Sequence, residues 1–229
     1  MSNTKIIYLF FFLVLMIQNG QGQDWANLER YKKENSQLKE PKANEKRVVF
    51  MGNSITEGWS RLSPDFFKDK PYINRGISGQ TTPQMVLRFK QDVINLKPSV
   101  VVILAGINDI AQNTGPMTLE ETATNIFTMA ELAKVHGIKV IMCTVLPAAA
   151  FPWRPQINPA PKVVELNLML KKYAKEHNIT FVDYYTPMVN QSQGLKNELG
   201  EDGVHPNAKG YAIMEQLISS AIAKLSPKK

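Results

Sequence analysis

The feature that most constrains the fold is a regular alternation of short apolar runs with longer amphipathic segments. The predicted strands lie at residues 47–52, 72–76, 99–106, 138–147 and 179–185, the second of them short and partly polar, and segments with helical apolar spacing lie at 81–98, 117–137, 161–178 and 207–225. Runs without polar alternation are typical of strands that are covered on both faces. Strands that alternate with helices predict a parallel sheet with right-handed crossovers. We therefore expect an α/β fold, a three-layer α/β/α sandwich around a central parallel sheet of about five strands.

Residues that commonly begin helices lie where this pattern needs them. The first long helix is expected to have Thr82 at its cap and Pro83 at its first position. Thr118 and Glu121 have the spacing of a capping box, in which each side chain accepts a hydrogen bond from the backbone N–H of the other residue. Asn207 is expected to cap the last helix.

The first 22 residues have the layout of a secretory signal peptide. Lys5 is followed by an apolar run at residues 6–17 and then by small and polar residues, which predicts cleavage near Gly22. The run is shorter than a typical membrane-spanning helix, and an uncleaved anchor helix is the alternative. We expect an exported protein, periplasmic or secreted, with no stable membrane insertion after cleavage.

The rest of the chain divides into a polar lead segment and one domain. Residues 23–45 are rich in charge, and we expect a helix there on the outside of the domain. Residues 46–229 carry the strand and helix pattern without an internal repeat. The chain of 229 residues is 44% hydrophobic, which is enough for one sizeable core.

Charge and cysteine content argue against several function classes. The net charge is +7, but the basic residues are scattered, so we expect a solvated surface and no nucleic-acid partner. The single cysteine, Cys143, lies inside an apolar run, where a thiol behaves as a small hydrophobic group. With three histidines, no H-E-x-x-H and no cysteine pair, the sequence does not support a metal site, and we expect no cofactor.

Parallel sheets of this kind bind ligands beyond the carboxyl ends of their strands, and that rule selects candidate residues. Ser54 directly follows the first strand, so it is either a helix cap or an exposed nucleophile. His136 and His177 end helices, whereas His205 lies in a turn three residues after Asp202. At that spacing a carboxylate can meet the imidazole and fix its tautomer, although Asp202 is also a common type of turn residue.

Two further residues follow strands at the same edge and can donate hydrogen bonds to a developing negative charge. Gly76 ends the second strand, where a backbone N–H can face the site, and Asn108 follows the third strand with a side-chain amide. A turn glycine and an amide that closes a loop are the alternatives for these residues. All four blocks occur in order, each in a loop that can border one site, which favours acyl-transfer chemistry.

These blocks resemble those of the SGNH hydrolases, also called GDSL-type esterases and lipases. The matching stretches are GNSIT with Ser54, NRGISG with Gly76, GIND with Asn108, and DGVHPN with Asp202 and His205. The resemblance covers nearly all of the expected domain. It implies a flavodoxin-like fold, Ser54 as the nucleophile, His205 as the base and Asp202 as the residue that orients it. It also implies an oxyanion hole made by the backbone N–H groups of Ser54 and Gly76 and by the side chain of Asn108.

One position departs from the family pattern. The family commonly has Asp before the serine, and here the residue is Asn53, whose amide can still hydrogen-bond to nearby backbone. The departure weakens the match to the lipase and lysophospholipase branches. No G-x-S-x-G motif is present, which argues against the ordinary α/β-hydrolase fold.

Substrate preference is less strongly indicated. Residues 146–161 form a long proline-rich loop at the carboxyl end of a strand, and such loops often carry specificity. Trp153 and Arg154 in this loop, together with Trp59, are candidate substrate contacts, with packing at the edge of the core as the alternative for the tryptophans. The site loops contain no obvious aliphatic run, which favours a small acyl group and a hydroxyl-rich alcohol.

The whole pattern, including the stretch FPWRP, looks like that of exported GDSL-like proteins of gut-type bacteria. These are often grouped with carbohydrate O-acetylesterases and with acetylhydrolases of the platelet-activating-factor type. The resemblance implies a serine esterase that cleaves a small O-acyl ester, acetyl above all, on a small molecule or a glycan. Two alternatives stay open: a lysophospholipase or thioesterase that acts on longer acyl chains, and a non-catalytic glycan-binding module.

Overall fold

The centre of the molecule is one sheet of five parallel strands. The computed structural model describes residues 24–225, so the expected signal peptide lies outside the described residues and stays a prediction. The strands are β1 (Val48–Gly52), β2 (Tyr72–Gly76), β3 (Val100–Leu104), β4 (Lys139–Cys143) and β5 (Thr180–Val182). Each strand lies inside one of the predicted strand ranges, and the predicted fold class is confirmed.

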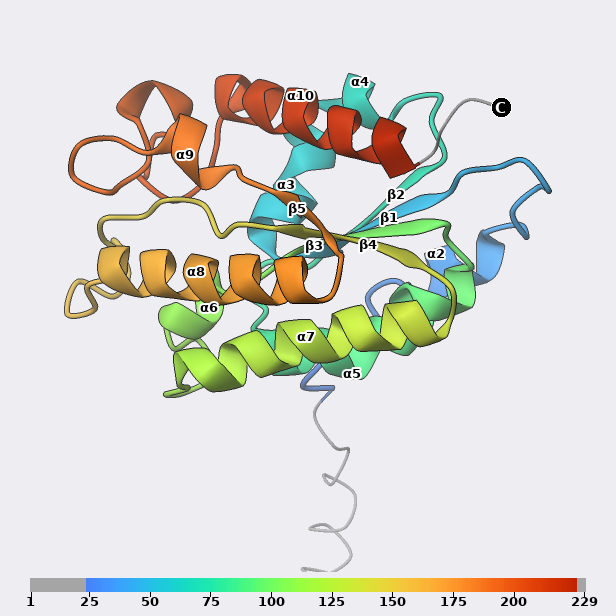
Figure 1. The fold of residues 1–229 in the computed structure, drawn as a ribbon, viewed down its shortest axis with the longest axis horizontal. Coiled ribbons are helices and arrows are strands. Elements are labelled where there is room, and N and C mark those ends of the chain that lie inside the picture. Colours follow the sequence, from blue (N-terminus) through green and yellow to red (C-terminus); the bar gives the residue numbers. More distant parts are fainter. Residues whose placement is uncertain (1–23, 226–229) are drawn as a thin grey trace, which may run out of the picture.

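Helices cover both faces of this sheet (Figure 1). The helices α3, α4 and α10 lie on one face, and α5, α7 and α8 lie on the other. Within the described part of the chain, no helix is long and apolar enough to span a membrane. The helix bounds are α2 (Lys32–Gln37), α3 (Ser54–Leu62), α4 (Pro64–Phe67), α5 (Thr82–Asp92), α6 (Ile107–Ile110), α7 (Leu119–Val135), α8 (Ala160–Glu176), α9 (Tyr185–Met188) and α10 (Ala208–Leu225), with 3₁₀ turns at Ile94–Leu96 and Asn197–Leu199.

The order of the strands places the site. The order is β2-β1-β3-β4-β5, so β1 pairs with β2 on one side and with β3 on the other. From β1 the chain first goes to β2 on one side and then crosses to β3 on the other side. At such a switch point the loops after the two central strands diverge and leave a crevice at their carboxyl ends. Ser54 comes two residues after the last residue of β1 and lies at this crevice.

The capping signals read from the sequence hold for two helices. Thr118 and Glu121 form the predicted box: the Glu121 N–H lies 3.1 Å from Thr118 Oγ1, and the Thr118 N–H lies 2.8 Å from Glu121 Oε2. Asn207 caps α10, because its Oδ1 accepts the backbone N–H groups of Lys209 and Gly210. These caps satisfy backbone donors that have no partner inside the helix.

The cap of α5 lies one residue before the predicted one. Thr81 is the cap and pairs with Gln84 in a capping box, so the assignment of Thr82 as the cap is wrong. Thr82 instead donates its hydroxyl to Asp109 Oδ1 at 2.6 Å and its N–H to the same atom at 2.9 Å. Thr82 is bonded to Asp109, which is distant in sequence, and Thr81 caps the helix.

The described part of the lead segment, residues 24–45, packs on the domain and contains a shorter helix than we expected. Its only α-helix is α2, and turns precede it. Ala26 and Tyr31 are buried, and Asn35 Nδ2 lies 2.7 Å from Asp92 Oδ1 in α5. A straight helix could contact the domain through one face only. The contacts of Ala26, Tyr31 and Asn35 instead hold a bent segment along the surface of the domain.

Candidate active site

Ser54 lies where β1 gives way to α3, and it is the first residue of that helix. Asn53 caps the helix: its Oδ1 accepts the Ile55 N–H at 3.1 Å, which confirms that the amide at this position hydrogen-bonds to nearby backbone. The first backbone N–H groups of a helix have no partner inside it. The Ser54 N–H is therefore available to a ligand at the same place as the Ser54 hydroxyl.

The hydroxyl of Ser54 contacts the imidazole of His205. Ser54 Oγ and His205 Nε2 are 2.8 Å apart, although 151 positions separate the two residues in sequence. On the other side of the ring, His205 Nδ1 and Asp202 Oδ2 are 2.6 Å apart. An imidazole held between a hydroxyl and a carboxylate can accept the hydroxyl proton at Nε2 while Nδ1 keeps its hydrogen.

Asp202 is held by the turn that it starts. Its Oδ1 accepts the backbone N–H of His205 at 2.7 Å and that of Val204 at 2.9 Å. Partial burial acts to raise the pKa of Asp202, but the hydrogen bonds from the backbone and from the imidazole together outweigh it, and the pKa lies below the ordinary 3.8. The carboxylate is therefore ionised throughout the neutral range and can stabilise a protonated His205.

The other two histidines serve helix ends. His136 and His177 are the C-cap residues of α7 and α8, as the sequence predicted. His136 Nδ1 lies 2.8 Å from the Leu132 carbonyl oxygen, and the His177 ring stacks on Tyr173. His205 is thus the histidine that the fold brings to Ser54.

Asn108 borders the same edge of the sheet and is buried in α6. Its Nδ2 donates one hydrogen bond to the Gln80 carbonyl oxygen at 2.9 Å, so the loop-closing role is real. An amide nitrogen carries two hydrogens. The bond to Gln80 leaves the second hydrogen for a ligand and orients the amide that carries it.

Gly76 does not supply a free donor, in contrast to the prediction. Its N–H is bonded to Asn74 Oδ1 at 2.9 Å, and the residue is buried at the end of β2. A Cβ at Gly76 would lie 2.1 Å from Glu57 N and 2.7 Å from Asn53 O. Glycine is therefore needed here because β2 packs against the backbone at the start of α3.

The free backbone donor of this loop lies three residues later, at Gly79. Gly79 is exposed and has a φ of +78°, in the region that favours glycine. A Cβ there would meet no atom within 4 Å, so backbone conformation and not packing selects glycine. Within residues 24–225, no recorded hydrogen bond uses the Gly79 N–H. A Ser-Gly pair between a strand and a helix is the signal in the sequence that indicates such a turn.

Trp59 is a core residue, and the prediction that it contacts substrate is wrong. Its side chain is 1% exposed and stacks on Phe66 and Tyr211 with ring centroids 5.1 and 5.5 Å away. Its indole N–H donates to Glu215 Oε1 at 3.0 Å. The apolar face of α3 carries Trp59 inward, on the side of the helix opposite to solvent.

Trp153 lies beside His205, but neither Trp153 nor Arg154 lines the groove next to Ser54. Trp153 is 44% exposed, and its ring centroid is 6.3 Å from that of His205. It stacks on the buried ring of Phe151 at 5.2 Å. Arg154 is half-buried in the same loop, and what separates the two residues is the ring of Trp153 beside that of His205.

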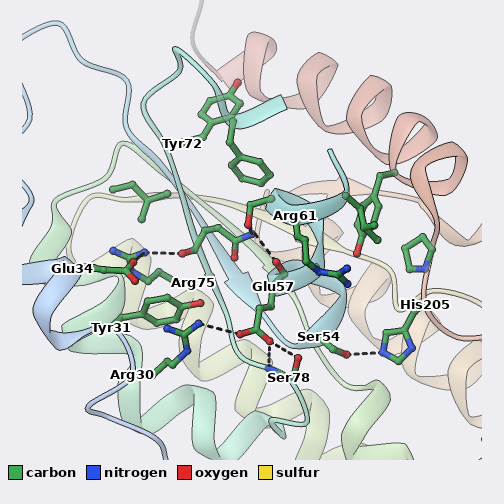
Figure 2. Close-up of a pocket in the computed structure, with 18 of the residues that line it drawn as sticks. Arg30, Tyr31, Glu34, Ser54, Glu57, Arg61, Tyr72, Arg75, Ser78 and His205 are labelled. Atoms are coloured by element: carbon green, nitrogen blue, oxygen red, sulfur yellow. Dashed lines mark hydrogen bonds and ion pairs between the residues drawn. The ribbon is translucent and has the colours of Figure 1, made fainter. Parts of the chain in front are cut away.

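A groove of about 1100 Å³ opens beside Ser54 and His205. Charged side chains of Glu57 and Arg61 line it near Ser54, and Arg30 contacts Glu57 from the side away from Ser54 (Figure 2). The groove also contains an apolar set of side chains, namely Leu38, Leu62, Phe67, Tyr72 and Ile73. The groove therefore offers ionic and hydrogen-bonding partners next to the hydroxyl, and apolar surface elsewhere.

Sequence reasoning missed the charged residues of this groove. Arg30 comes from the lead segment, for which the sequence predicts only an outer helix, and Glu57 is not among the candidate site residues. Glu57 lies three residues after Ser54, and residues at that spacing share one face of a helix, so the spacing is a signal for Glu57. No local pattern indicates that Arg30 contacts Glu57, because the contact depends on how the lead segment packs.

Comparison with known proteins places the chain in a family. The model of the GDSL-like lipase/acylhydrolase family matches residues 50–213. An acetylxylan esterase from Xylanibacter ruminicola is 26% identical over 219 residues, which cover 80% of this chain and 44% of that protein. The chain thus spans less than half the length of this relative. Esterase TesA from Pseudomonas aeruginosa is 26% identical over 183 residues, which cover 77% of this chain and 82% of that protein.

Solved structures give the same assignment at higher identity. A GDSL-like lipase from Bacteroides thetaiotaomicron is 56% identical and has a TM-score of 0.85, with 87% of this chain and 98% of that chain covered. The family match extends over more than half of the sequence. The chain therefore belongs to the GDSL-like lipase/acylhydrolase family of ester-hydrolysing enzymes.

Proposed function

We propose that the protein hydrolyses a small O-acyl ester, acetyl above all, on a carbohydrate alcohol, with Ser54 as nucleophile, His205 as base and Asp202 as the carboxylate that orients the base. The observation that carries this proposal is the chain of contacts from Ser54 Oγ to His205 Nε2 at 2.8 Å and from His205 Nδ1 to Asp202 Oδ2 at 2.6 Å. These are the contacts that activate a serine hydroxyl. A non-catalytic glycan-binding module would not require them.

In the first half of the reaction, Ser54 Oγ attacks the carbonyl carbon of the ester while His205 Nε2 takes the hydroxyl proton. The tetrahedral adduct collapses, the alcohol oxygen leaves with the proton from His205, and the acyl group stays on Ser54. In the second half, His205 takes a proton from water as the water oxygen attacks the acyl carbon. The carboxylic acid then leaves, and the proton returns to Ser54 Oγ.

Three donors are assigned to the negative charge that collects on the carbonyl oxygen. They are the backbone N–H groups of Ser54 and Gly79 and the second N–H of the Asn108 amide. Support for Gly79 in place of Gly76 comes from the free N–H of Gly79 and the occupied N–H of Gly76. Fixed donors of this kind supply a large part of the rate enhancement in acyl transfer.

The character of the groove supports a polar leaving alcohol. The groove is lined by Arg30, Glu57 and Arg61, which suit hydroxyl groups better than methylene groups. Trp153 offers an aromatic surface beside His205, of the kind on which sugar rings can stack. The similarity to an acetylxylan esterase supports an acetylated sugar as the substrate.

A second candidate is a longer acyl chain, and one observation favours it. The apolar side chains of the groove, listed above, can cover a hydrocarbon chain at about 0.8 kcal/mol per buried methylene. The charged side chains near Ser54 oppose this binding mode, because the first methylene groups would lie against them. We therefore place the longer-chain activity second.

The layout of the first 22 residues supports an exported enzyme. Expression of the full chain in a bacterial host, followed by fractionation and N-terminal analysis, tests this part. Mature protein outside the cytoplasm that begins near residue 23 is the expected result. Uncleaved protein in the membrane fraction would indicate the anchor helix instead.

The deciding experiment compares acetyl, butyryl, octanoyl and decanoyl esters of one chromogenic alcohol, with an acetylated xylo-oligosaccharide assayed alongside. We expect kcat/KM to be highest for acetyl and acetate to be released from the sugar. A value of kcat/KM that climbs to decanoyl, without acetate release, would establish the second candidate. A fluorophosphonate probe that fails to label the wild-type protein at Ser54 would remove both.

A further inference from the structure

The donor that we assign to Gly79 belongs to a β-turn whose shape decides where that N–H points. The Gln80 N–H bonds to the Ile77 carbonyl oxygen at 3.3 Å, which closes a turn over residues 77–80. Gly79 has positive φ and Ser78 does not, which is the pattern of a type II turn. Types I and II differ by a flip of the central peptide, and the Gly79 N–H is part of that peptide.

One side chain holds the residue before this peptide. Glu57 Oε2 accepts the backbone N–H of Ser78 at 3.0 Å and also accepts the Ser78 hydroxyl (Figure 2). Glu57 lies on α3 one turn after Ser54. The helix that starts with the nucleophile therefore also carries the group that holds the donor turn.

The lead segment holds Glu57 in turn. Arg30 Nη2 lies 3.3 Å from Glu57 Oε1, so both carboxylate oxygens have partners. The Arg30 guanidinium lies over the Tyr31 ring at 4.8 Å from its centroid, and the Tyr31 hydroxyl donates to the Gly76 carbonyl oxygen. The Glu57 and Arg30 side chains are 31% and 43% exposed, and an ion pair at such a place contributes little to folding stability. Its effect is expected in the geometry of the turn.

The far side of the turn is held independently. Asn113 Nδ2 donates to the Gly79 carbonyl oxygen at 3.1 Å, and Asn108 Nδ2 donates to the Gln80 carbonyl oxygen at 2.9 Å. With the peptide after Gly79 fixed by Asn113 and the peptide before Ser78 fixed by Glu57, the central peptide between them has one orientation available. Loss of either support frees it to flip.

We propose that Glu57 is a positioning residue for ester hydrolysis: it fixes the turn at residues 77–80 so that the Gly79 N–H stays directed at the carbonyl oxygen, and Arg30 of the lead segment holds Glu57 in place. The inference rests on the proposed function, in which Gly79 is an oxyanion donor. Under this proposal the lead segment contributes to the site through Arg30.

The test uses the full-length protein with Glu57→Ala, Glu57→Gln and Ser78→Ala. Complete loss of one oxyanion donor costs roughly 100- to 1000-fold in kcat, so we expect a mispositioned donor to cost about 10- to 100-fold in Glu57→Ala, with KM nearly unchanged. Glu57→Gln keeps an acceptor oxygen and should recover most of kcat. Ser78→Ala keeps the N–H contact and should lose only a few-fold.

Two further readouts separate positioning from folding. Phenylboronic acid forms a tetrahedral adduct with an active serine and places an oxygen among the oxyanion donors. Its inhibition constant should therefore weaken in Glu57→Ala by about the same factor as kcat/KM, while the thermal midpoint stays close to that of the wild type. Glu29→Ala is the matched control, since it removes an exposed ion pair of the same segment, with Lys32 at 2.8 Å, away from the turn.

The outcomes separate this inference from the proposed function. If the wild-type protein hydrolyses no ester and Ser54 takes no fluorophosphonate label, the proposed function fails. If the wild type is active and Ser54→Ala is not, but Glu57→Ala keeps full kcat and full boronate affinity, the positioning role is overturned. A loss of kcat in Glu57→Ala that Glu57→Gln does not restore, together with a lowered thermal midpoint in both, would also overturn it in favour of a structural role.

Discussion

Two loops at the carboxyl edge of the sheet border the proposed site, and they are held in different ways. The loop after β2 has its backbone groups bonded by side chains from separate parts of the chain, namely Glu57, Asn108 and Asn113. In the loop after β4, the stretch 147–159 has three hydrogen bonds with described residues, all between backbone groups: two lie within the loop, and one joins the Val163 N–H of α8 to the Pro159 carbonyl oxygen. This stretch is anchored instead by the buried side chains of Phe151 and Ile157.

The difference follows from what each loop has to do. A hydrogen bond fixes direction as well as distance, and a donor for an oxyanion must point at one atom. Apolar contact is non-directional, so it anchors the loop after β4 and leaves its exposed tip, with Trp153, free to differ between relatives. We therefore expect chemistry to depend on the first loop and substrate choice on the second.

The largest expected effect is the loss of kcat on replacing Ser54, the nucleophile that both loops border. Ser54→Ala should lower kcat by about a million-fold, since the acyl-enzyme can no longer form. Steady-state hydrolysis of an acetyl ester and fluorophosphonate labelling measure it. Ser60→Ala on the same helix is the control. Among the described residues its exposed hydroxyl bonds to the Glu57 carbonyl oxygen and to Asn74 Nδ2, each at 3.3 Å, and not to Ser54 or His205. A Ser54→Ala protein that keeps a tenth of the activity would mean that another group is the nucleophile.

Asp202→Asn is expected to lower kcat by about ten-thousand-fold, because the amide no longer fixes the tautomer of His205.

The same variant should change how folding stability depends on pH. The pKa of Asp202 is lowered below 3.8, so its contribution to folding stability is present above pH 3.8 and is lost as the pH falls through the lowered pKa. Thermal midpoints measured from pH 6 to pH 2 should show this loss in the wild type and lack it in Asp202→Asn.

Acid should reduce activity, because His205 must be neutral to accept the Ser54 proton. The pH dependence of kcat/KM measures this effect. The double variant with His136→Gln and His177→Gln should keep the wild-type profile, since neither ring contacts Ser54. A changed acid limb in the double variant would mean that the base is not His205.

Loss of a single oxyanion donor is expected to lower kcat by less than loss of Ser54 or Asp202. Asn108→Ala and Gly79→Ala should each lower kcat by roughly 100- to 1000-fold with KM little changed, the second because alanine disfavours positive φ and the turn then flips. Gly137→Ala is a close control, with a φ of +72° and an equally open Cβ position away from the site. Full activity in Gly79→Ala would break the link between the directed loop and the chemistry.

The smallest effect concerns the second loop. Trp153→Ala should raise KM for an acetylated oligosaccharide by about 3- to 10-fold, the value of one aromatic contact of 0.5–1.5 kcal/mol, and leave kcat nearly unchanged. A chromogenic acetyl ester should show almost no change. If Trp153→Ala instead lowers kcat for both substrates, the two loops do not divide the work as proposed.

The sequence alone was enough for residues whose position follows from local order. Apolar runs predicted β1, β3 and β4, and shorter, more mixed stretches predicted β2 and β5. A residue just after a strand lies at the carboxyl edge of the sheet, which located Ser54 and Asn108. Asp202 and His205 are three residues apart in one turn, so their contact depends on little beyond that turn. Asn53, which stands where the family commonly has Asp, also makes the expected hydrogen bond to nearby backbone.

Only the tertiary structure decided which of several similar residues has a free group. Gly76 and Gly79 are both plausible donors in sequence, but packing against α3 buries the first and its N–H is already bonded, while the second is left open. The two tryptophans differ for the same reason, since Trp59 meets the core and Trp153 meets solvent. Burial and long-range hydrogen bonds, such as that from Arg30 to Glu57, depend on segments that meet only after folding, and no local pattern encodes them.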